Sequence, residues 1–140
     1  MALFKRIAIL DLGTNTFLLL ISEVDANGPR TIHQERAYVS LGEGSLEQGI
    51  LTLEAQERAF EALRSFKKHI DDYQVAQVQA VATSTLRSVS NGEAFVQQVK
   101  QEIGIDIKII DGEEEAALVY EGVKKGVSLG EDPVLMIDIG

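Results

Sequence analysis

The segment LDLGTNTFLLLI, residues 10–21, joins two strongly apolar runs through a short polar turn. The first run begins at Ile7 and delivers one carboxylate, Asp11, and the second run begins at Phe17. Residues 13–16 are a glycine followed by small polar residues, which lets the backbone turn tightly and point N–H and hydroxyl groups at an anion. A carboxylate at the end of such a strand is suited to a divalent cation. Because Asp-x-Gly is also a common turn device, this segment alone leaves a purely structural turn open.

Three strands are predicted around this turn. They cover Arg6–Asp11, Phe17–Val24 and Thr31–Leu41, which are rich in Ile, Val, Leu, Phe and Tyr. The separators GTNT and DANGPR are both turn-forming compositions. We therefore expect an antiparallel meander of three strands at the start of the chain.

The period of the apolar residues changes after Thr52. Apolar side chains recur at helical spacing as far as Ile70, and Thr52 stands where it can cap the helix that they define. Residues 75–84 alternate and then become fully apolar, as expected for a strand that enters a core. Residues 90–93, Ser-Asn-Gly-Glu, have the pattern of a capping box and predict a helix that continues to Ile103.

The last third of the chain predicts a strand, a helix and a further strand. Residues 105–110 alternate as a strand, residues 111–126 have a helical pattern, and residues 134–139 begin another strand. Four apolar side chains of that helix are expected to lie inside, namely Ala117, Leu118, Val119 and Val123. The order over residues 1–126 is thus β-β-β-α-β-α-β-α, which predicts an α/β fold.

Composition excludes several classes of protein. A chain of 140 residues with 45% hydrophobic and 25% charged residues suits one compact folded domain. No apolar stretch approaches the roughly 18 residues that a membrane span needs, and the N-terminus lacks a small-residue cleavage site. The net charge of −9 opposes binding to a nucleic-acid backbone. We therefore expect a soluble cytoplasmic protein that binds neither membranes nor nucleic acid.

The residue inventory favours a metal held by oxygen. The chain has no cysteine, which excludes disulfides and thiolate metal sites. Its two histidines, His33 in a predicted strand and His69 near a predicted helix end, have no partner at the spacing of a metal site. We expect a hard cation such as Mg²⁺ rather than zinc.

The end of the chain repeats a sequence pattern found at its beginning. IAILDLG at residues 7–13 and VLMIDIG at residues 134–140 each have four apolar residues, an Asp, an aliphatic residue and a Gly. Two such turns facing each other would clamp a phosphate chain, with Asp11 and Asp138 holding a divalent cation that offsets its charge. In a chain this short, the repeat could also arise by chance.

Five motifs together resemble one known family. They are DLGTNTFLLLI at 11–21, LGEG at 41–44, ATSTLRSVSNGEAF at 82–95, DGEEEA at 111–116 and VLMIDIG at 134–140. In order and spacing the chain resembles the exopolyphosphatase and guanosine pentaphosphate phosphohydrolase (Ppx/GppA) family, within the superfamily of actin, sugar kinases and heat-shock ATPases. The resemblance spans essentially the whole chain.

The resemblance implies an actin-like ATPase (ribonuclease H-like) domain with a mixed five-stranded sheet flanked by helices. Residues 1–126 would be the N-terminal actin-like domain, and residues 127–140 the connection and first strand of a second, truncated domain. The implied activity is release of terminal phosphate from polyphosphate or guanosine pentaphosphate (pppGpp), assisted by Mg²⁺. Its implied partners are these substrates and the missing C-terminal domain. A second copy of the chain could cover the surface that this domain would bury, giving a homodimer.

The family pattern also implies roles for particular residues. Asp11 and Asp138 would bind the metal, and Glu115, with its neighbour Glu114, would activate the attacking water. The residues implied to bind phosphate are Gly13, Thr14, Asn15, Thr16 and Arg87. Leu18 and Ser40 depart from the pattern, since many relatives carry a basic residue at these positions.

Other interpretations of these residues stay open. The three consecutive glutamates at 113–115 also fit a well-capped helix, because Asp111 can cap it and carboxylates are favoured in a first turn. Arg87 also fits a solvated charge or a structural ion pair. The alternatives for function are an ATP-binding kinase or ATPase of the same superfamily, and a noncatalytic module that binds phosphorylated ligands or mediates association.

Overall fold

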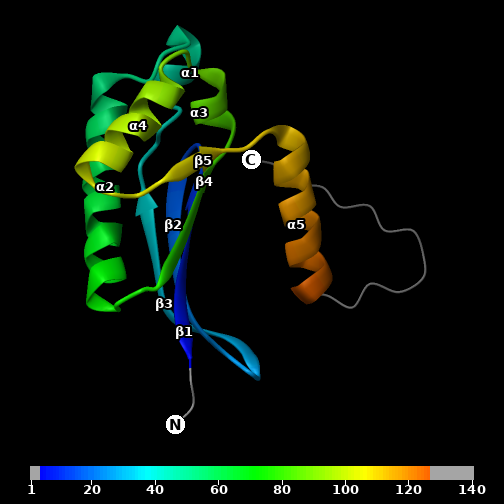
Figure 1. Cartoon of the computed structure of the whole chain (residues 1–140). Coiled ribbons are helices and arrows are strands. Elements are labelled where there is room, and N and C mark those ends of the chain that lie inside the picture. The colour runs from blue at the N-terminus through cyan, green and yellow to red at the C-terminus, as the bar shows by residue number, and fades with distance from the viewer. Residues whose placement is uncertain (1–3, 127–140) are drawn as a thin grey trace, which may run out of the picture.

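The computed structural model describes residues 4–126 (Figure 1). Its strands are β1 (Lys5–Leu12), β2 (Thr16–Asp25), β3 (Gly28–Tyr38), β4 (Gln77–Ala82) and β5 (Ile107–Ile109). Its helices are α1 (Ser45–Gln48), α2 (Leu53–Asp72), α3 (Ser84–Ser88), α4 (Gly92–Glu102) and α5 (Gly112–Gly126). The predicted strand at 134–139, with Asp138, and the predicted connection at 127–140 lie outside the described residues.

The strands form one mixed five-stranded sheet in the order β3-β2-β1-β4-β5. The meander predicted at the start of the chain is confirmed, because β1 pairs antiparallel with β2 and β2 antiparallel with β3. β4 then crosses over to pair parallel with β1, and β5 pairs parallel with β4. The carboxyl ends of β1, β4 and β5 therefore lie at the same end of the sheet, and the loops that follow these strands gather there.

The core lies between the sheet and the helices α2 and α4, which cover the same face of the sheet in Figure 1. Alternate strand residues point into this layer and are buried, namely Ala8, Leu10, Leu12, Phe17, Leu19, Ile21, Ala80 and Ala82. From the helices, Phe60 meets Phe95 edge to face at 5.5 Å between ring centroids. The predicted cap of α2 is confirmed, since the side chain of Thr52 accepts a hydrogen bond from the backbone N–H of Ala55 at 3.2 Å.

The helix α5 lies on the other side of the sheet from α2 and α4 (Figure 1). The expectation that its apolar residues lie inside is wrong for the described structure, because no α5 residue is buried. Leu118 is 52% exposed and Tyr120 is 47% exposed. Within residues 4–126, no element covers this helix closely enough to bury its apolar side chains.

Two further differences concern short helices and caps. The helices α1 and α3 were not predicted, because each is only one turn long and too short to show a helical period. The predicted capping box at 90–93 is wrong: Asn91, not Ser90, is the N-cap of α4, and its side chain makes no capping hydrogen bond. That side chain instead binds the backbone of Leu51, which lies on the loop before α2. Among the described helices, none is both long and apolar enough to cross a membrane.

Candidate functional site

The turn between β1 and β2 is tightly closed. The N–H of Gly13 donates to the carbonyl of Thr16 at 3.1 Å, which brings the two ends of the turn together. A side-chain carbon on Gly13 would stand 3.0 Å from that same carbonyl oxygen, closer than nearly all real contacts. The predicted need for glycine at this position therefore has a direct steric cause.

A second loop, residues 39–42, docks on this turn. The N–H groups of Val39 and Ser40 both donate to the carbonyl of Asn15, at 3.0 and 2.9 Å, and that of Gly42 donates to the carbonyl of Thr14 at 3.1 Å. A Cβ on Gly42 would lie 2.6 Å from the methyl carbon of Thr14. The LGEG motif thus matters because its first glycine lets the two loops pack backbone to backbone.

Arg58 of α2 holds this second loop in place. Its Nε donates to the carbonyl of Val39 at 2.7 Å, and its Nη2 donates to the carbonyl of Ser40 at 3.0 Å. Ser40 has a φ of 49°, a left-handed conformation that is uncommon for a non-glycine residue. Sequence reasoning missed Arg58, because nothing in the helical pattern around it signals a contact with residues 39–40.

Three hydroxyl groups meet behind the turn. The Oγ1 of Thr14 lies 2.9 Å from the Oγ of Ser84 and accepts a hydrogen bond from the Oγ1 of Thr85 at 3.0 Å. Thr85 is only 1% exposed, so this cluster is anchored in the core. Ser84 and Thr85 were not predicted as site residues, although the hydroxyl-rich ATSTLR segment carried that signal.

Asp11 lies on the face of the sheet opposite α2 and α4. It precedes the last residue of β1, is exposed, and is in register with Leu18 on one side and Val81 on the other. This face is opposite the layer of α2 and α4, because the neighbouring residues Leu10 and Leu12 point into that core. An exposed carboxylate at a strand end fits the oxygen-ligand chemistry of Mg²⁺. Asp138, the second predicted ligand, cannot be placed, since it lies beyond the described part of the chain.

Arg87 and Glu115 form an ion pair at the end of the sheet where the carboxyl ends of β1, β4 and β5 lie. Arg87 belongs to α3, which follows β4, and Glu115 belongs to α5, which follows β5. Both Nη atoms of Arg87 lie 3.4 Å from the Oε2 of Glu115, and Nη1 also donates to the carbonyl of Ile110 at 2.6 Å. The two side chains are 33% and 31% exposed, so the pair lies at the rim, where solvent or a ligand can reach it.

The two predicted catalytic glutamates diverge. Glu114 pairs with Lys108 on β5, with 2.7 Å between Oε1 and Nζ, and its backbone N–H donates a hydrogen bond to the Oδ1 of Asp111 at 2.8 Å. The capping predicted for Asp111 is therefore present. Only Glu115 of this pair faces the predicted phosphate contact, Arg87.

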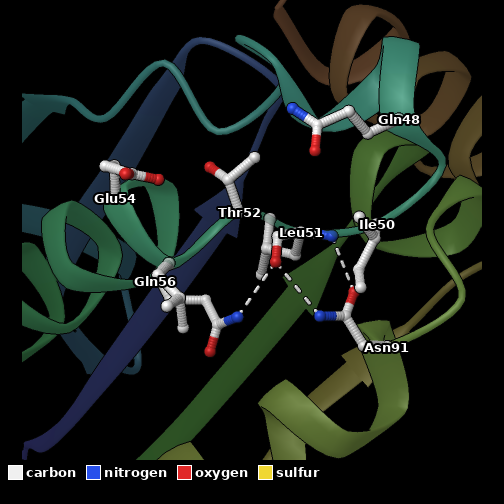
Figure 2. A pocket seen from close by; sticks show the side chains of 8 residues that line it. Gln48, Ile50, Leu51, Thr52, Glu54, Gln56 and Asn91 are labelled. Atoms are coloured by element: carbon white, nitrogen blue, oxygen red, sulfur yellow. Dashed lines mark hydrogen bonds between the residues drawn. The ribbon is translucent and has the colours of Figure 1, made fainter.

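A shallow pocket of about 460 Å³ lies at the start of α2 (Figure 2). Figure 2 shows Asn91 bound to both backbone groups of Leu51, with Gln56 donating to the same carbonyl at 3.0 Å. None of the predicted phosphate, metal or catalytic residues lines this pocket. Asn91 joins α4 to the loop before α2, and Gln56 and Thr52 bind backbone groups at the start of α2, which are structural roles.

The expectation that the two histidines lack a metal-ligating partner is wrong. The structure brings His33 of β3 and His69 of α2 together with Glu35, so that one ligand atom of each lies within 4.8 Å of the others. Spacing along the sequence could not reveal this, because the strand and the helix are adjacent only in the folded chain.

Comparisons with known proteins identify the family and the fold of the chain. The family model described as the Ppx/GppA phosphatase family matches residues 20–140. An exopolyphosphatase from Cytophaga hutchinsonii is similar in structure, with a TM-score of 0.84 and 40% identity over 86% of this chain and 39% of that one. A Ppx/GppA family member from Aquifex aeolicus has a TM-score of 0.82 and 31% identity over 86% of this chain and 40% of that one. The chain thus spans about two fifths of the length of these relatives.

Proposed function

The chain belongs to the Ppx/GppA phosphatase family, and from this membership we propose that it forms the N-terminal lobe of a phosphohydrolase. In this proposal, the enzyme works in the cytoplasm and releases the terminal phosphate of inorganic polyphosphate or of guanosine pentaphosphate. Residues 127–140 connect to a second lobe and supply its first strand. Substrate binds between the lobes, at the carboxyl ends of β1, β4 and β5.

The observation that carries the proposal is the pairing of Arg87 with Glu115. A guanidinium binds phosphate as readily as it binds a carboxylate, often through two hydrogen bonds. An incoming terminal phosphate would therefore compete with Glu115 for Arg87. Binding of substrate would draw the arginine onto phosphate and leave the carboxylate free to act on water.

Glu115 then acts as the general base. It accepts a proton from a water molecule whose oxygen forms a bond to the terminal phosphorus, while the bridging P–O bond breaks and the shortened chain leaves with its electron pair. Gly13, Thr14, Asn15 and Thr16 shape the turn that faces the phosphates. Because the hydroxyl of Thr14 is engaged by Ser84 and Thr85, its contribution is to hold the turn rigid as well as to contact the ligand.

Asp11 and Asp138 are the residues that would hold Mg²⁺. When bound, the ion offsets the charge of the phosphate chain and of the acidic protein. This matters because the chain has a net charge of −9, which by itself repels a polyanion. Within the site, Arg87 is the cation placed to oppose that field.

The test replaces the carboxylate of Glu115 by an amide of nearly the same size, which cannot act as a base. Glu115→Gln in the full-length natural protein should lower phosphate release from polyphosphate at least about 100-fold, as expected for loss of a general base. Glu113→Gln, a change to an exposed neighbour in the same helical turn, is the matched control and should retain activity. Equal turnover of the Glu115→Gln variant and the natural protein, measured with malachite green, would refute the assignment.

The ion pair also favours a second candidate function, a noncatalytic module that binds phosphorylated ligands. If Glu115 serves only to hold Arg87, the Glu115→Gln variant would still bind polyphosphate and the natural protein would release no phosphate. Measuring binding and turnover on the same two proteins separates a binder from a catalyst.

A further inference from the structure

The two histidines of this chain meet one glutamate between β3 and α2. His33 and Glu35 are two residues apart on β3, so their side chains share one face of the strand. Their partners in register, Ile21 and Leu19, are buried in the layer that α2 covers, which places both side chains under that helix. His69 comes from the last turn of α2 and completes the group.

The distances between these side chains suit a shared metal ion. The Oε2 of Glu35 lies 3.0 Å from the Nε2 of His69 and 3.7 Å from the Nε2 of His33. Two ligands bound to one zinc ion at about 2.0–2.1 Å are separated by roughly 3.0 Å at right angles and about 3.4 Å at the tetrahedral angle. These two separations lie close to this range, and the ligand atoms of the two histidines lie within 4.8 Å of each other, so side-chain rotations would be needed to bring all three atoms onto one ion.

Two atoms of the cluster have unmet bonding capacity. The Nε2 of His33 and the Oε2 of Glu35 are buried and make no hydrogen bond within the described residues, although His69 approaches that oxygen. A buried polar atom without a partner is unfavourable, and a bound cation would satisfy both atoms. The other carboxylate oxygen of Glu35 accepts a hydrogen bond from the hydroxyl of Ser65 at 3.1 Å, which fixes Oε2 toward the histidines.

We propose that His33, Glu35 and His69 form a binding site for a divalent transition-metal ion of the Zn²⁺ type, with water completing its coordination. Two imidazoles and one carboxylate match the ligand preference of such ions, whereas Mg²⁺ and Ca²⁺ prefer oxygen ligands alone. The three side chains are 21%, 28% and 33% exposed, while the Nε2 of His33 and the Oε2 of Glu35 are buried, so an ion reaches them by displacing the edges of these side chains. The ion fastens the edge strand β3 to α2.

This site is separate from the proposed phosphate site. Asp11 points to the opposite face of the sheet from the layer that contains His33 and Glu35. Arg87 and Glu115 lie beyond β4 and β5, whereas β3 is the strand at the other edge of the sheet. The proposal therefore goes beyond the phosphohydrolase function and does not depend on it.

The first experiment titrates Zn²⁺ into the complete 140-residue chain, free of any affinity tag and stripped with a chelator, by isothermal titration calorimetry. We expect one ion per chain, and no competition from an excess of Mg²⁺. Binding should weaken on acidification, because a ligating imidazole must be neutral. Since the chain has only two histidines and no cysteine, a change in both imidazole ¹⁵N signals on adding Zn²⁺ reports directly on this site.

Variants decide whether the three residues are the ligands. His69→Gln and Glu35→Gln should each lower the Zn²⁺ affinity at least about tenfold. Asp72→Asn, a change to an exposed carboxylate near the end of α2, should leave the affinity unchanged. Ser65→Ala keeps all three ligands and should weaken binding less, which tests the site even if a ligand variant folds poorly. Absence of binding, or equal affinity in the His69→Gln and Glu35→Gln variants, would overturn the proposal and leave a packed histidine–glutamate cluster.

Discussion

At the scale of single residues, the site depends on close contacts that only glycine allows. Gly42→Ala would place a methyl group 2.6 Å from the Thr14 side chain, which cannot easily move because its hydroxyl is held by Ser84 and Thr85. We expect a loss of about 1–3 kcal/mol in the free energy of unfolding, as for overpacking elsewhere. Urea denaturation of the 140-residue chain measures this loss.

The matched control for that substitution is Gly122→Ala in α5. A side chain there would meet nothing within 4 Å, so the change should be neutral or stabilise by up to about 1 kcal/mol through helix propensity. If both variants unfold at the same urea concentration, the two loops do not pack as tightly as the structure indicates.

Arg87 should also contribute to stability, because its Nη1 donates to the carbonyl of Ile110 at 2.6 Å. Arg87→Ala removes this charge-assisted hydrogen bond and should cost about 1–2 kcal/mol in the free energy of unfolding. Lys100→Ala, which removes a well-exposed pair with Asp106, should cost less than about 1 kcal/mol. An Arg87→Ala variant as stable as the starting chain would show that the carbonyl contact is weak in solution.

At this scale the sequence predicted the residue types better than their contacts. Asp11 near the end of β1 and Glu115 in the first turn of α5 lie where the local pattern predicted them, whereas Arg87 lies in α3, a helix that was not predicted. Spacing along the sequence could not reveal the Arg87–Glu115 pair or the His33–Glu35–His69 cluster. Each joins two elements that are distant in the sequence and come together only when the chain folds.

At the scale of elements, the caps are where local sequence and structure agree most directly. Thr52→Ala removes the acceptor for the backbone N–H of Ala55 and should cost about 1 kcal/mol, a typical value for loss of an N-cap. Thr52→Ser keeps the hydroxyl and should cost much less. Equal losses in the two variants, measured by thermal unfolding, would show that packing of the Thr52 methyl group matters more than the hydrogen bond.

The long elements were predictable because their burial repeats at a fixed period. Buried residues recur at every second position through most of β1 and β2 and at helical spacing in α2, as their geometry requires. The one-turn helices α1 and α3 have no such repeat. The capping box at 90–93 failed because α4 begins one residue later than predicted, so that Asn91 rather than Ser90 is its N-cap, and the Asn91 side chain binds the backbone of Leu51 instead of capping the helix.

The helix α5 provides the clearest conflict between pattern and burial. Leu118→Gln changes a side chain that is 52% exposed and should alter the free energy of unfolding of the 140-residue chain by less than about 0.5 kcal/mol. Leu63→Ala, in the fully buried core under α2, should cost about 2–5 kcal/mol. A large loss for Leu118→Gln would mean that another surface covers this helix in solution, such as that of a second copy of the chain.

At the scale of the whole molecule, the described residues supply one side of the proposed phosphate site. The turn at 13–16, Asp11, Arg87 and Glu115 all lie at the end of the sheet where β1, β4 and β5 have their carboxyl ends. The chain spans about two fifths of the length of its structural relatives. Hydrolysis of phosphate bonds relies on positioning and on neutralising charge from several sides. A chain with a net charge of −9, whose described residues place one arginine at the site, can do little alone to position a polyphosphate or to neutralise its charge.

We therefore expect the 140-residue chain to fold but to release almost no phosphate from polyphosphate, even with Mg²⁺ present. Folding should be cooperative, because the described residues form one contiguous buried core between the sheet and the helices α2 and α4. The full-length natural protein, assayed with malachite green at equal molar concentration, is the positive control. Circular dichroism of the same samples ensures that inactivity does not reflect an unfolded chain. Turnover by the 140-residue chain close to that of the full-length protein would contradict the two-lobe proposal, because one acidic lobe would then position and neutralise the substrate unaided.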